Sequence, residues 1–392
     1  MLPPASDLDI VFHNRRAKLR AAAFGHVGLL EAYFDGDLDV GGLREALALG
    51  MAGGFDRPNA LVGLRNAWHE WRFSNSTWER AKRNARAHYG LGADFYRLWL
   101  DEPLMMYTCA YWKEGTRTLE QAQADKVDHV CRKLRLAPGE SVADIGCGFG
   151  GFMFHAQRHF GARVTGVNTT PEQVEMVRGE IAARGLGDSL SVVETDFRDA
   201  FAEHDKLASI GVLEHAGRDQ LREVVRAHAR FLKPGGVGLL HFIGHVGEAP
   251  TEFFIRRYVF PGGWIPALAD VLVAMEEAGL EVLDVENLRR HYALTLDAWA
   301  ERFERNWERI HALDPRRFDE RFRRVWRAYL YGCAEMFRSP AGRTHLFQIV
   351  FSRGNATLES YPRTRDFLYA EEARADTKAS ARALRAVGGE PR

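Results

Sequence analysis

Short apolar runs and longer amphipathic stretches alternate between about residues 125 and 290. Each run is short enough for a buried strand, and the stretches between them have the apolar spacing of helices. Strands that alternate with helices of about 10–15 residues predict a parallel sheet covered by helices on both faces. The runs with strand character lie at residues 141–146, 162–168, 190–196, 206–212 and 237–243. The pattern therefore predicts a doubly wound α/β fold.

The chain before this region has a different character. Residues 1–85 are mainly polar with helical spacing and predict a small, mainly helical N-terminal domain. Within it, residues 28–40 (GLLEAYFDGDLDV) carry alternating apolar positions around an Asp-Gly-Asp turn. This segment predicts a short β-hairpin.

The chain after the alternating blocks predicts two helices, at residues 297–310 and 321–337, and a late strand at 345–353. We expect that strand to be an edge strand that pairs with residues 281–288. Residues 86–369 then form the larger domain. Residues 370–392 are rich in Ala, Arg and Glu, lack a run of large apolar residues, and predict a disordered tail.

Composition narrows the class of protein. Apolar residues make up 46% of the 392 residues, enough for a sizeable core. Lys and Arg together number 53, as do Asp and Glu, so net charge gives no argument for a nucleic-acid partner. The four cysteines form no C-x-x-C pair, so we expect no metal and a reduced, cytoplasmic protein. No apolar run is long enough to cross a bilayer, which leaves contact with a membrane surface open.

A glycine-rich loop follows the first strand of the predicted sheet. Residues 144–151 (DIGCGFGG) place four glycines between a strand and a helix, where the backbone turns tightly and approaches a ligand. The spacing is D-x-G-x-G-x-G and differs from the G-x-G-x-x-G of dinucleotide-binding proteins. It is the pattern of S-adenosylmethionine (SAM) methyltransferases, with Asp144 at the strand end and Gly146 and Gly148 in the loop.

Further polar residues follow the next strands in the order that a SAM site needs. Asn168 ends the second strand, where its side chain would reach the ribose hydroxyls, and Gln173 begins the next helix. Asp196 ends the third strand, where its carboxylate would accept from the adenine amine, and Phe197 would cover the ring. Many such enzymes carry Asp or Glu in place of Asn168; an amide still hydrogen-bonds a hydroxyl, but without charge.

Five segments together resemble the cyclopropane-fatty-acid synthase family. They are HYGLGADFYRLWLDEPLMMYTCAYW (residues 88–112), IGCGFGG (145–151), GVLEHAG (211–217), LLHFIG (239–244) and HYALTLDAW (291–299). The resemblance extends from about residue 25 to about residue 353. It implies a SAM-dependent transfer of a methyl group to the cis double bond of a phospholipid acyl chain, followed by closure of a cyclopropane ring.

This chemistry explains why aromatic and apolar residues would surround the site. An alkene that takes the methyl group of SAM becomes a carbocation, so water must be excluded. Aromatic faces stabilise a cation by about 0.5–2 kcal/mol each without attacking it. A proton must then leave the new methyl group so that the ring can close, and in the family a bound bicarbonate ion is the base.

The resemblance also implies the residues of the bicarbonate site, which are Cys109, Glu214, His241, Ile243 and Tyr292. We expect backbone amides near Cys109 and Ile243, the His241 side chain and the Tyr292 hydroxyl to donate to the anion. Glu214 would orient His241 or accept a proton. Nothing in the sequence supplies a base for Cys109, so we do not interpret it as a nucleophile. His215 is equally consistent with a structural and a catalytic role.

The strip of residues 105–112 (MMYTCAYW) contains residues of both predicted sites. The resemblance implies that Tyr107 and Thr108 contact SAM, directly before Cys109 of the bicarbonate site. The strip would then close the SAM pocket, hold bicarbonate and form part of the wall of an acyl tunnel.

Two arginine-containing segments each have two interpretations. Residues 253–266 (FFIRRYVFPGGWIP) predict either a substrate cap whose Arg256 and Arg257 meet lipid phosphates or a helix with a solvated basic edge. Residues 321–332 (RFRRVWRAYLYG) carry four arginines at helical spacing, which fits an anionic membrane surface and a solvated helix face equally well.

Three alternatives to a cyclopropane synthase stay open. A relative of the family would convert the same cation into a methylene or methyl-branched chain. A small-molecule N- or O-methyltransferase would need a polar pocket with a base, against which the apolar strip argues. A lipid-binding protein without activity would not need the intact glycine loop. The expected partners are an unsaturated membrane phospholipid at the inner face of the membrane and a second copy of the chain in a homodimer.

Overall fold

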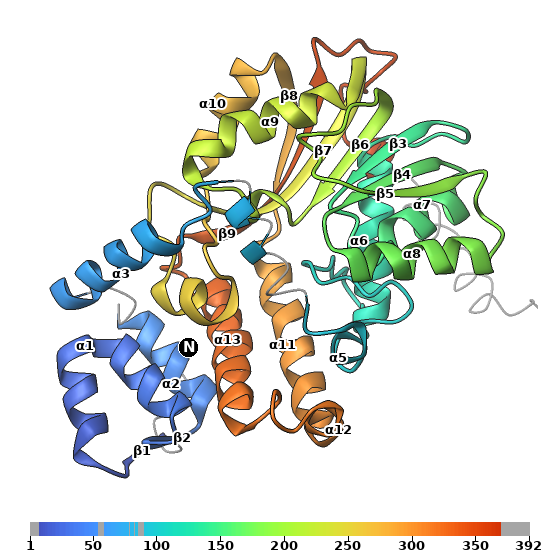
Figure 1. Cartoon of the computed structure of the whole chain (residues 1–392). Helices are drawn as coiled ribbons and strands as arrows, with labels where there is room; N and C mark the ends of the chain where they lie inside the picture. Colours follow the sequence, from blue (N-terminus) through green and yellow to red (C-terminus); the bar gives the residue numbers. More distant parts are fainter. Residues whose placement is uncertain (1–7, 54–58, 78, 82, 85–89, 370–392) are drawn as a thin grey trace, which may run out of the picture.

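The computed structural model describes residues 8–53, 59–77, 79–81, 83–84 and 90–369. Its centre is a seven-stranded sheet with the strand order β5-β4-β3-β6-β7-β9-β8 (Figure 1). The strands are β3 (Ser141–Ile145), β4 (Arg163–Asn168), β5 (Leu190–Glu194), β6 (His204–Ile210), β7 (Leu232–His245), β8 (Leu280–Asn287) and β9 (Thr344–Arg353). Strand β9 runs antiparallel to the other six. The doubly wound fold is confirmed.

Helices cover both faces of this sheet. On one face, α6 (Leu119–Lys133), α7 (Gly151–Phe160) and α8 (Pro171–Ala183) share an apolar cluster with the strands. On the other, α9 (Leu221–Arg230) and α10 (Leu268–Glu277) form a second cluster. Because the central strands are buried on both faces, their sequences are continuous apolar runs without alternation.

The order of the strands brings the polar residues that follow the strand ends to one edge of the sheet. Parallel strands that lie side by side have their carboxyl ends at the same edge, which is where such sheets bind ligands. Gly146 follows β3, Asn168 ends β4 and Asp196 follows β5. In β7, His241 is paired with Ile210, the last residue of β6, so it reaches the same edge.

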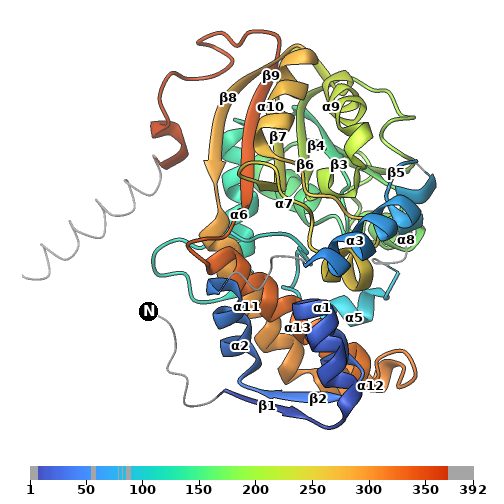
Figure 2. The same ribbon diagram turned by 90° about the vertical axis from the view of Figure 1, so that its left-hand side faces the viewer.

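A third, aromatic cluster lies beyond this edge. It is built by α5 (Ala93–Arg97), the π-helical turn η4 (Ile255–Val259), α11 (Arg289–Arg305), α12 (Trp307–Leu313) and α13 (Glu320–Arg338). The N-terminal elements are β1 (Asp9–Phe12), α1 (Arg15–Phe34), β2 (Leu38–Gly41), α2 (Leu43–Ala52) and α3 (Ala60–Phe73). Residues of α1, β2 and α2 belong to the same cluster as α11 and α13. Figure 2 shows these helices together in its lower half, below the sheet.

The hairpin predicted for residues 28–40 is wrong. Residues up to Phe34 continue helix α1, and after the turn at Asp35–Asp37 strand β2 pairs with β1 instead. Helical spacing explains the outcome, because Val27, Glu31 and Phe34 are buried on one side of α1. Alternation over a few residues did not distinguish this side of a helix from a strand.

The late strand pairs with the predicted partner but is not the edge strand. Residues of β9 pair with β7 on one side and with β8 on the other, so β8 forms the edge. Nearly every residue of β9 is buried. A continuous apolar run such as HLFQIVF is typical of an interior strand, and this signal outweighs position in the chain.

The four arginines of α13 bind other parts of the protein. Arg321 contacts Asp35, Arg323 and Arg327 contact Glu304, and Arg324 contacts Asp39. Arg324 also donates to the carbonyls of Tyr33 and Leu38. The arginines thus join the N-terminal elements and α11 to α13, a role that neither interpretation of this segment included.

The described helices do not include one with the length and apolar content needed to cross a bilayer. Residues 370–392, for which the sequence predicts a disordered tail, lie outside the described part of the chain. The division into domains at about residue 85 stays a prediction.

Candidate functional site

Two cavities meet at the carboxyl edge of the sheet. The smaller, about 170 Å³, lies against the glycine loop, and the larger, about 630 Å³, extends between the sheet, η4, α11 and α13. Both are lined by Tyr107, Thr108, Gly211 and His215. These four residues form a shared wall, across which a group held in one cavity could react with a group held in the other.

The strip of residues 105–112 has no regular secondary structure, and side chains rather than a strand ladder hold it. Asp101 accepts a hydrogen bond from the Met106 amide at 2.9 Å. Gln123 of α6 donates to the Met106 and Thr108 carbonyls at 3.2 and 2.8 Å. Lys126, one turn further along α6, donates to the Thr108 hydroxyl at 2.9 Å. The shared wall is thus positioned from behind by three fully buried polar side chains.

Lys126 is the buried cation behind this wall. Its ammonium faces the buried carboxylates of Asp101 and Asp144, which favour its charged form, while burial lowers its pKa. Burial raises the pKa of Asp144 to about 7, and the charge of Lys126 opposes that rise. A lysine without solvent needs such carboxylates nearby, because an isolated buried charge is very costly.

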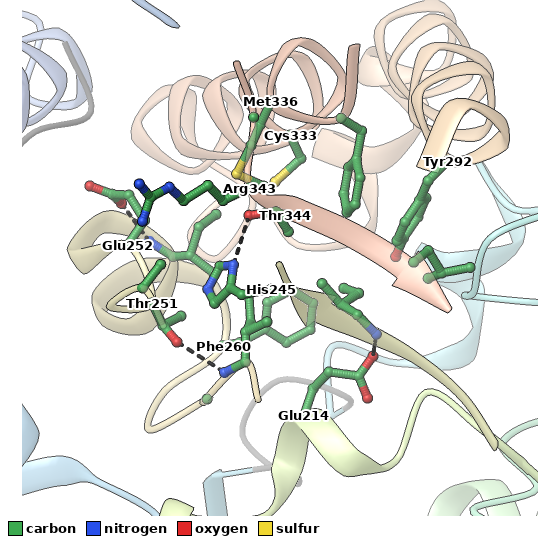
Figure 3. Close-up of a pocket in the computed structure, with 18 of the residues that line it drawn as sticks. Glu214, His245, Thr251, Glu252, Phe260, Tyr292, Cys333, Met336, Arg343 and Thr344 are labelled. Carbon is green, nitrogen blue, oxygen red and sulfur yellow. Dashed lines mark hydrogen bonds between the residues drawn. The ribbon is translucent and has the colours of Figure 1, made fainter. Parts of the chain in front are cut away.

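Glu214 lines the larger cavity and binds the backbone of β7. Its Oε1 accepts a hydrogen bond from the Ile243 amide at 2.7 Å (Figure 3). Its Oε2 is buried and has no partner among the described residues. Burial raises the pKa of Glu214 to about 7. The expectation that the Ile243 amide donates to an anion is not met here, because Glu214 accepts from that amide.

His241 lies on β7, two residues before Ile243, and is 1% exposed. Its Nδ1 lies 3.1 Å from the side-chain nitrogen of Gln348 on β9. With the Gln348 amide in this orientation, its nitrogen donates to Nδ1 and the ring proton is on Nε2. His241 Nε2 has no partner among the described residues, and burial keeps the pKa of the ring well below its ordinary value. At neutral pH the ring is therefore an uncharged donor.

Cys109 and Tyr292 line the same cavity as Glu214 and His241. Cys109 is fully buried, its Sγ lies 3.3 Å from the Ala110 carbonyl, and burial raises its pKa well above the ordinary range. The thiol is therefore neutral and unsuited to nucleophilic attack. Tyr292 of α11 packs against Phe337 at a ring distance of 4.6 Å and points toward the region of Glu214 (Figure 3).

The amide that follows Cys109 is also engaged. Ala110 donates its backbone N–H to the Thr295 hydroxyl at 3.1 Å. The structure thus brings all five predicted bicarbonate residues to one cavity, but two of the amides expected to serve the anion bind protein groups.

The smaller cavity is lined by the glycine loop and by eight of the nine residues predicted for SAM. These are Tyr107, Thr108, Gly146, Gly148, Asn168, Gln173, Asp196 and Phe197. Gly146 has φ +72°, and a Cβ there would lie 2.5 Å from Val212. Only glycine tolerates both conditions. The ninth residue, Asp144, lies outside the lining and is 2% exposed.

Asn168 and Gln173 are hydrogen-bonded to each other. The Asn168 side-chain nitrogen donates to Gln173 Oε1 at 3.0 Å and to the Gly148 carbonyl at 3.3 Å. Its oxygen accepts from the Thr170 amide at 3.0 Å. The amide at position 168 thus ties the ends of β3 and β4 together. A carboxylate could not donate these two bonds.

Asp196 forms a bidentate ion pair with Arg198. Its two oxygens accept from Arg198 Nε and Nη2 at 2.8 and 2.6 Å, and both side chains are buried. Asp196 Oδ1 also accepts from the Arg198 amide at 3.0 Å, so the carboxylate is held in a fixed position at the cavity. Phe197 lies beside it, with its ring 5.0 Å from His228.

The segment of residues 253–266 forms part of the wall of the larger cavity, as the cap interpretation predicts. Phe253, Ile255, Phe260 and Trp264 line it. Arg256 does not reach a ligand, because it is 5% exposed and binds Asn66 and Glu70 of α3. The expectation that Arg256 meets a lipid phosphate is therefore wrong, whereas Arg257 is exposed.

Sequence reasoning did not find several residues that complete the site. They are Asp101, Gln123, Lys126, Arg198, Tyr329 and Gln348; Tyr329 meets the Tyr107 hydroxyl at 2.9 Å. One signal was available, because Gln123 and Lys126 stand on the apolar side of the helix that contains Ala122, Val127 and Val130. Polar residues at such core positions indicate a buried network. No group of three or more His, Cys, Asp or Glu side chains within the described ranges could hold a metal ion.

Comparison with known proteins agrees with this geometry. The family model described as mycolic acid cyclopropane synthetase matches residues 76–349. A probable fatty acid methyltransferase of Pseudomonas putida is 40% identical over 294 residues, 72% of each chain. The cyclopropane-fatty-acyl-phospholipid synthase of Escherichia coli K12 is 33% identical over 349 residues, 88% of each chain.

Solved structures show the same fold. The mycolic acid cyclopropane synthase CmaA1 complexed with SAH and CTAB aligns with a TM-score of 0.64 and 33% identity, over 69% of this chain and 98% of that one. Coclaurine N-methyltransferase, at 21% identity and a TM-score of 0.66, shows the fold alone. The sheet order, the glycine loop and these matches identify a class I SAM-dependent methyltransferase, and the chain belongs to the mycolic acid cyclopropane synthetase family.

Proposed function

We propose that this enzyme transfers a methyl group from SAM to the cis double bond of an unsaturated phospholipid acyl chain and closes a cyclopropane ring. The observation that carries the proposal is the shared wall of Tyr107, Thr108, Gly211 and His215. On one side of it is the pocket with the SAM motif. On the other is a large, mainly apolar cavity that suits an acyl chain.

The larger cavity supports cation chemistry beside this wall. Tyr107 lies between the two cavities, with its ring 6.4 Å from Phe260 and its hydroxyl bonded to Tyr329. Aromatic rings stabilise a neighbouring cation, and the apolar lining excludes the water that would trap it. SAM, when bound, supplies the electrophilic methyl group, and the chain positions the alkene against it.

Bicarbonate fits the polar end of this cavity. His241 Nε2 is a buried donor and Glu214 Oε2 a buried acceptor, and neither has a partner among the described residues. Bicarbonate has an O–H that can donate to Glu214 Oε2 and oxygens that can accept from His241 Nε2, so its chemistry complements both atoms. His241, Glu214 and Tyr292 would hold it, and when bound it would supply the base that ring closure requires.

The substrate is proposed to be a lipid of a membrane that the enzyme meets from the cytoplasmic side. The Escherichia coli relative is named for fatty-acyl phospholipids, and the Pseudomonas putida relative for fatty acids. Association of the chain into a homodimer stays a prediction.

The test is an incubation of purified enzyme with SAM and vesicles of a cis-monounsaturated phospholipid, followed by mass spectrometry of the fatty acid methyl esters. We expect a product heavier by one CH₂ group that takes up no hydrogen under mild catalytic hydrogenation. Vesicles of a saturated phospholipid are the matched control and should yield no product.

Two other results would redirect the assignment. A product that has the mass of the cyclopropane product but takes up hydrogen would identify a methylene-forming enzyme. Such an activity is consistent with the name of the Pseudomonas putida relative. The absence of any lipid product from an enzyme that binds SAM would overturn the proposed substrate.

A further inference from the structure

Helix α3 carries large apolar side chains on the side that faces away from the protein. The exposed side chains are Leu61 (51% exposed), Leu64 (70%), Trp68 (58%) and Trp71 (75%). Their spacing of three and four residues places them along one side of the helix. Val62 and His69 on the opposite side are only 2% and 5% exposed. An exposed apolar strip of this kind marks a surface that another body covers.

The buried side of the same helix belongs to the larger cavity. Val62 and Asn66 line it, together with Met51 at the end of α2. Arg256 of η4 binds Asn66 and Glu70 and so fixes α3 to the cap segment. Figure 1 shows α3 at the left border of the molecule, beside the turn that contains η4. Whatever covers the exposed strip therefore lies next to the cavity that we assign to the acyl chain.

The charges around the strip favour an anionic surface. Arg72 is exposed beside the strip, with its guanidinium 5.2 Å from the ring of the half-exposed Phe73. Arg257 is exposed on the neighbouring turn and acts on His69 through its charge. The carboxylate of Glu70 contacts Arg256, which offsets its charge. Tryptophans with flanking arginines are typical of helices that lie in the headgroup region of a bilayer.

We propose that the exposed side of α3 docks the enzyme on an anionic phospholipid bilayer, with Leu61, Leu64, Trp68 and Trp71 entering the interface. Docking there brings the cavity beside α3 to the level of the acyl chains, so that a chain can enter without the lipid crossing water. Methylation of the lipid that enters rests on the proposed function, whereas docking itself does not. The arginines of α13, which bind protein carboxylates, have no part in it.

The experiment compares wild-type protein with the double variant Trp68→Gln/Trp71→Gln. Phe201→Gln is the matched control, because Phe201 is 71% exposed but lies between β5 and β6. Binding is measured by co-sedimentation with vesicles of saturated phosphatidylglycerol and phosphatidylcholine, which offer no double bond. Loss of two interfacial tryptophans should weaken vesicle binding at least about tenfold, and the control should bind as wild type does.

A second measurement reports on the tryptophans directly. Lipids brominated in the upper part of the acyl chain should quench the fluorescence of the wild-type protein and quench the double variant less. Binding of S-adenosylhomocysteine, the demethylated product of SAM, should be the same in all three proteins and shows that they are folded.

Three outcomes would overturn the docking proposal. They are wild-type protein that does not bind the vesicles, a double variant that binds as tightly as wild type, and a double variant that changes only the oligomeric state in sedimentation velocity. The last would assign the strip to a second copy of the chain. Vesicle binding without methyl transfer to unsaturated lipid would leave docking standing and overturn the proposed function.

Discussion

At the scale of single residues, Glu214 combines a fixed position with a pKa near neutral pH. The Ile243 amide holds one carboxylate oxygen, while the other is buried without a partner among the described residues, in a residue that lines the same cavity as His241. Burial raises its pKa from 4.5 to about 7. A carboxyl group that is hard to ionise is well suited to accept a proton and release it near neutral pH.

Replacement Glu214→Gln should therefore lower turnover by at least about a hundredfold. Binding of S-adenosylhomocysteine should not change, because Glu214 does not line the smaller cavity. In the wild-type enzyme turnover should rise as the pH increases through about 7, since Glu214 must be ionised to accept a proton. The measurement is a rate profile at constant bicarbonate concentration, and an unchanged rate in the variant would contradict the role.

The contribution of Glu214 to the stability of the protein should fall as the pH rises, whereas turnover should increase. The pKa of Glu214 is higher in the folded than in the unfolded chain, so its contribution to stability is lost as the pH rises from 4.5 through about 7. Glutamine keeps the acceptor for the Ile243 amide but has no charge to bury. At pH 8 the variant should melt at a higher temperature than wild type, and at pH 5 the two should differ little.

The role of Lys126 can also be tested separately. Its bond to the Thr108 hydroxyl makes that oxygen an acceptor and leaves the hydroxyl proton to be donated elsewhere. Thr108 lines the smaller cavity together with the glycine loop, and we expect it to meet the amino-acid part of SAM. We therefore expect Lys126 to be a positioning residue that acts through Thr108.

Replacement Lys126→Met should weaken binding of S-adenosylhomocysteine about tenfold, and should affect methylthioadenosine, which lacks the amino-acid part, much less. Thr108→Val should have a similar effect, and the two changes together should not add, because they remove one interaction. Lys133→Met is the control, since Lys133 is equally buried but binds Glu286. Equal losses for both ligands would show that Lys126 has only a structural role.

The sequence predicted the site residues that stand at the ends of strands, because each of them follows an apolar run that can be recognised in the sequence. It did not predict partners that lie far apart in the chain, such as Gln348 for His241 or Lys126 for Thr108. Nor did the resemblance reveal that Glu214 accepts from the Ile243 amide, since that bond depends on the path of the backbone between β6 and β7.

At the scale of elements, buried ion pairs join α6 to the edge of the sheet. Glu286 of β8 accepts from His129 at 2.8 Å and from Lys133 at 2.6 Å, and both partners are almost fully buried. These charges hold the pKa of Glu286 at about 2, although burial alone would raise it. The same helix carries Gln123 and Lys126, so its position determines the position of the shared wall.

Replacement Glu286→Gln should lower the free energy of unfolding by about 1–3 kcal/mol, because it leaves Lys133 buried without its counter-charge. The pKa of Glu286 is lower in the folded chain, so its contribution is present above about pH 4.5 and is lost as the pH falls toward 2. Urea unfolding at pH 7 measures the loss. Glu203→Gln, which breaks an exposed pair with Arg353, should change stability little.

Element prediction succeeded where the burial pattern is unambiguous. The alternating strands and helices between β3 and β7 were predicted because each strand is too short and too apolar to be a helix. Residues 28–34 were misassigned because one side of a short helix segment and one face of a strand place apolar residues at overlapping spacings. The position of β9 between β7 and β8 depends on long-range pairing that local pattern does not encode.

At the scale of the whole molecule, the N-terminal elements and the catalytic sheet enclose one cavity between them. Met51, Val62 and Asn66 line the same cavity as Glu214 and Tyr292. The alignment with the mycolic acid cyclopropane synthase structure covers 98% of that chain but only 69% of this one. Helix α3 lies outside residues 76–349, which the family model matches, so this enzyme can differ there in how it meets its lipid.

The proposed function depends on the fate of the transferred methyl group, which one measurement follows directly. The enzyme is incubated with SAM that carries a fully deuterated methyl group and with vesicles of a cis-monounsaturated phospholipid. Ring closure removes one deuteron from that group, so the predicted product carries two deuterons and has no double bond. A product that keeps all three deuterons, or that retains a double bond, would contradict cyclopropane formation.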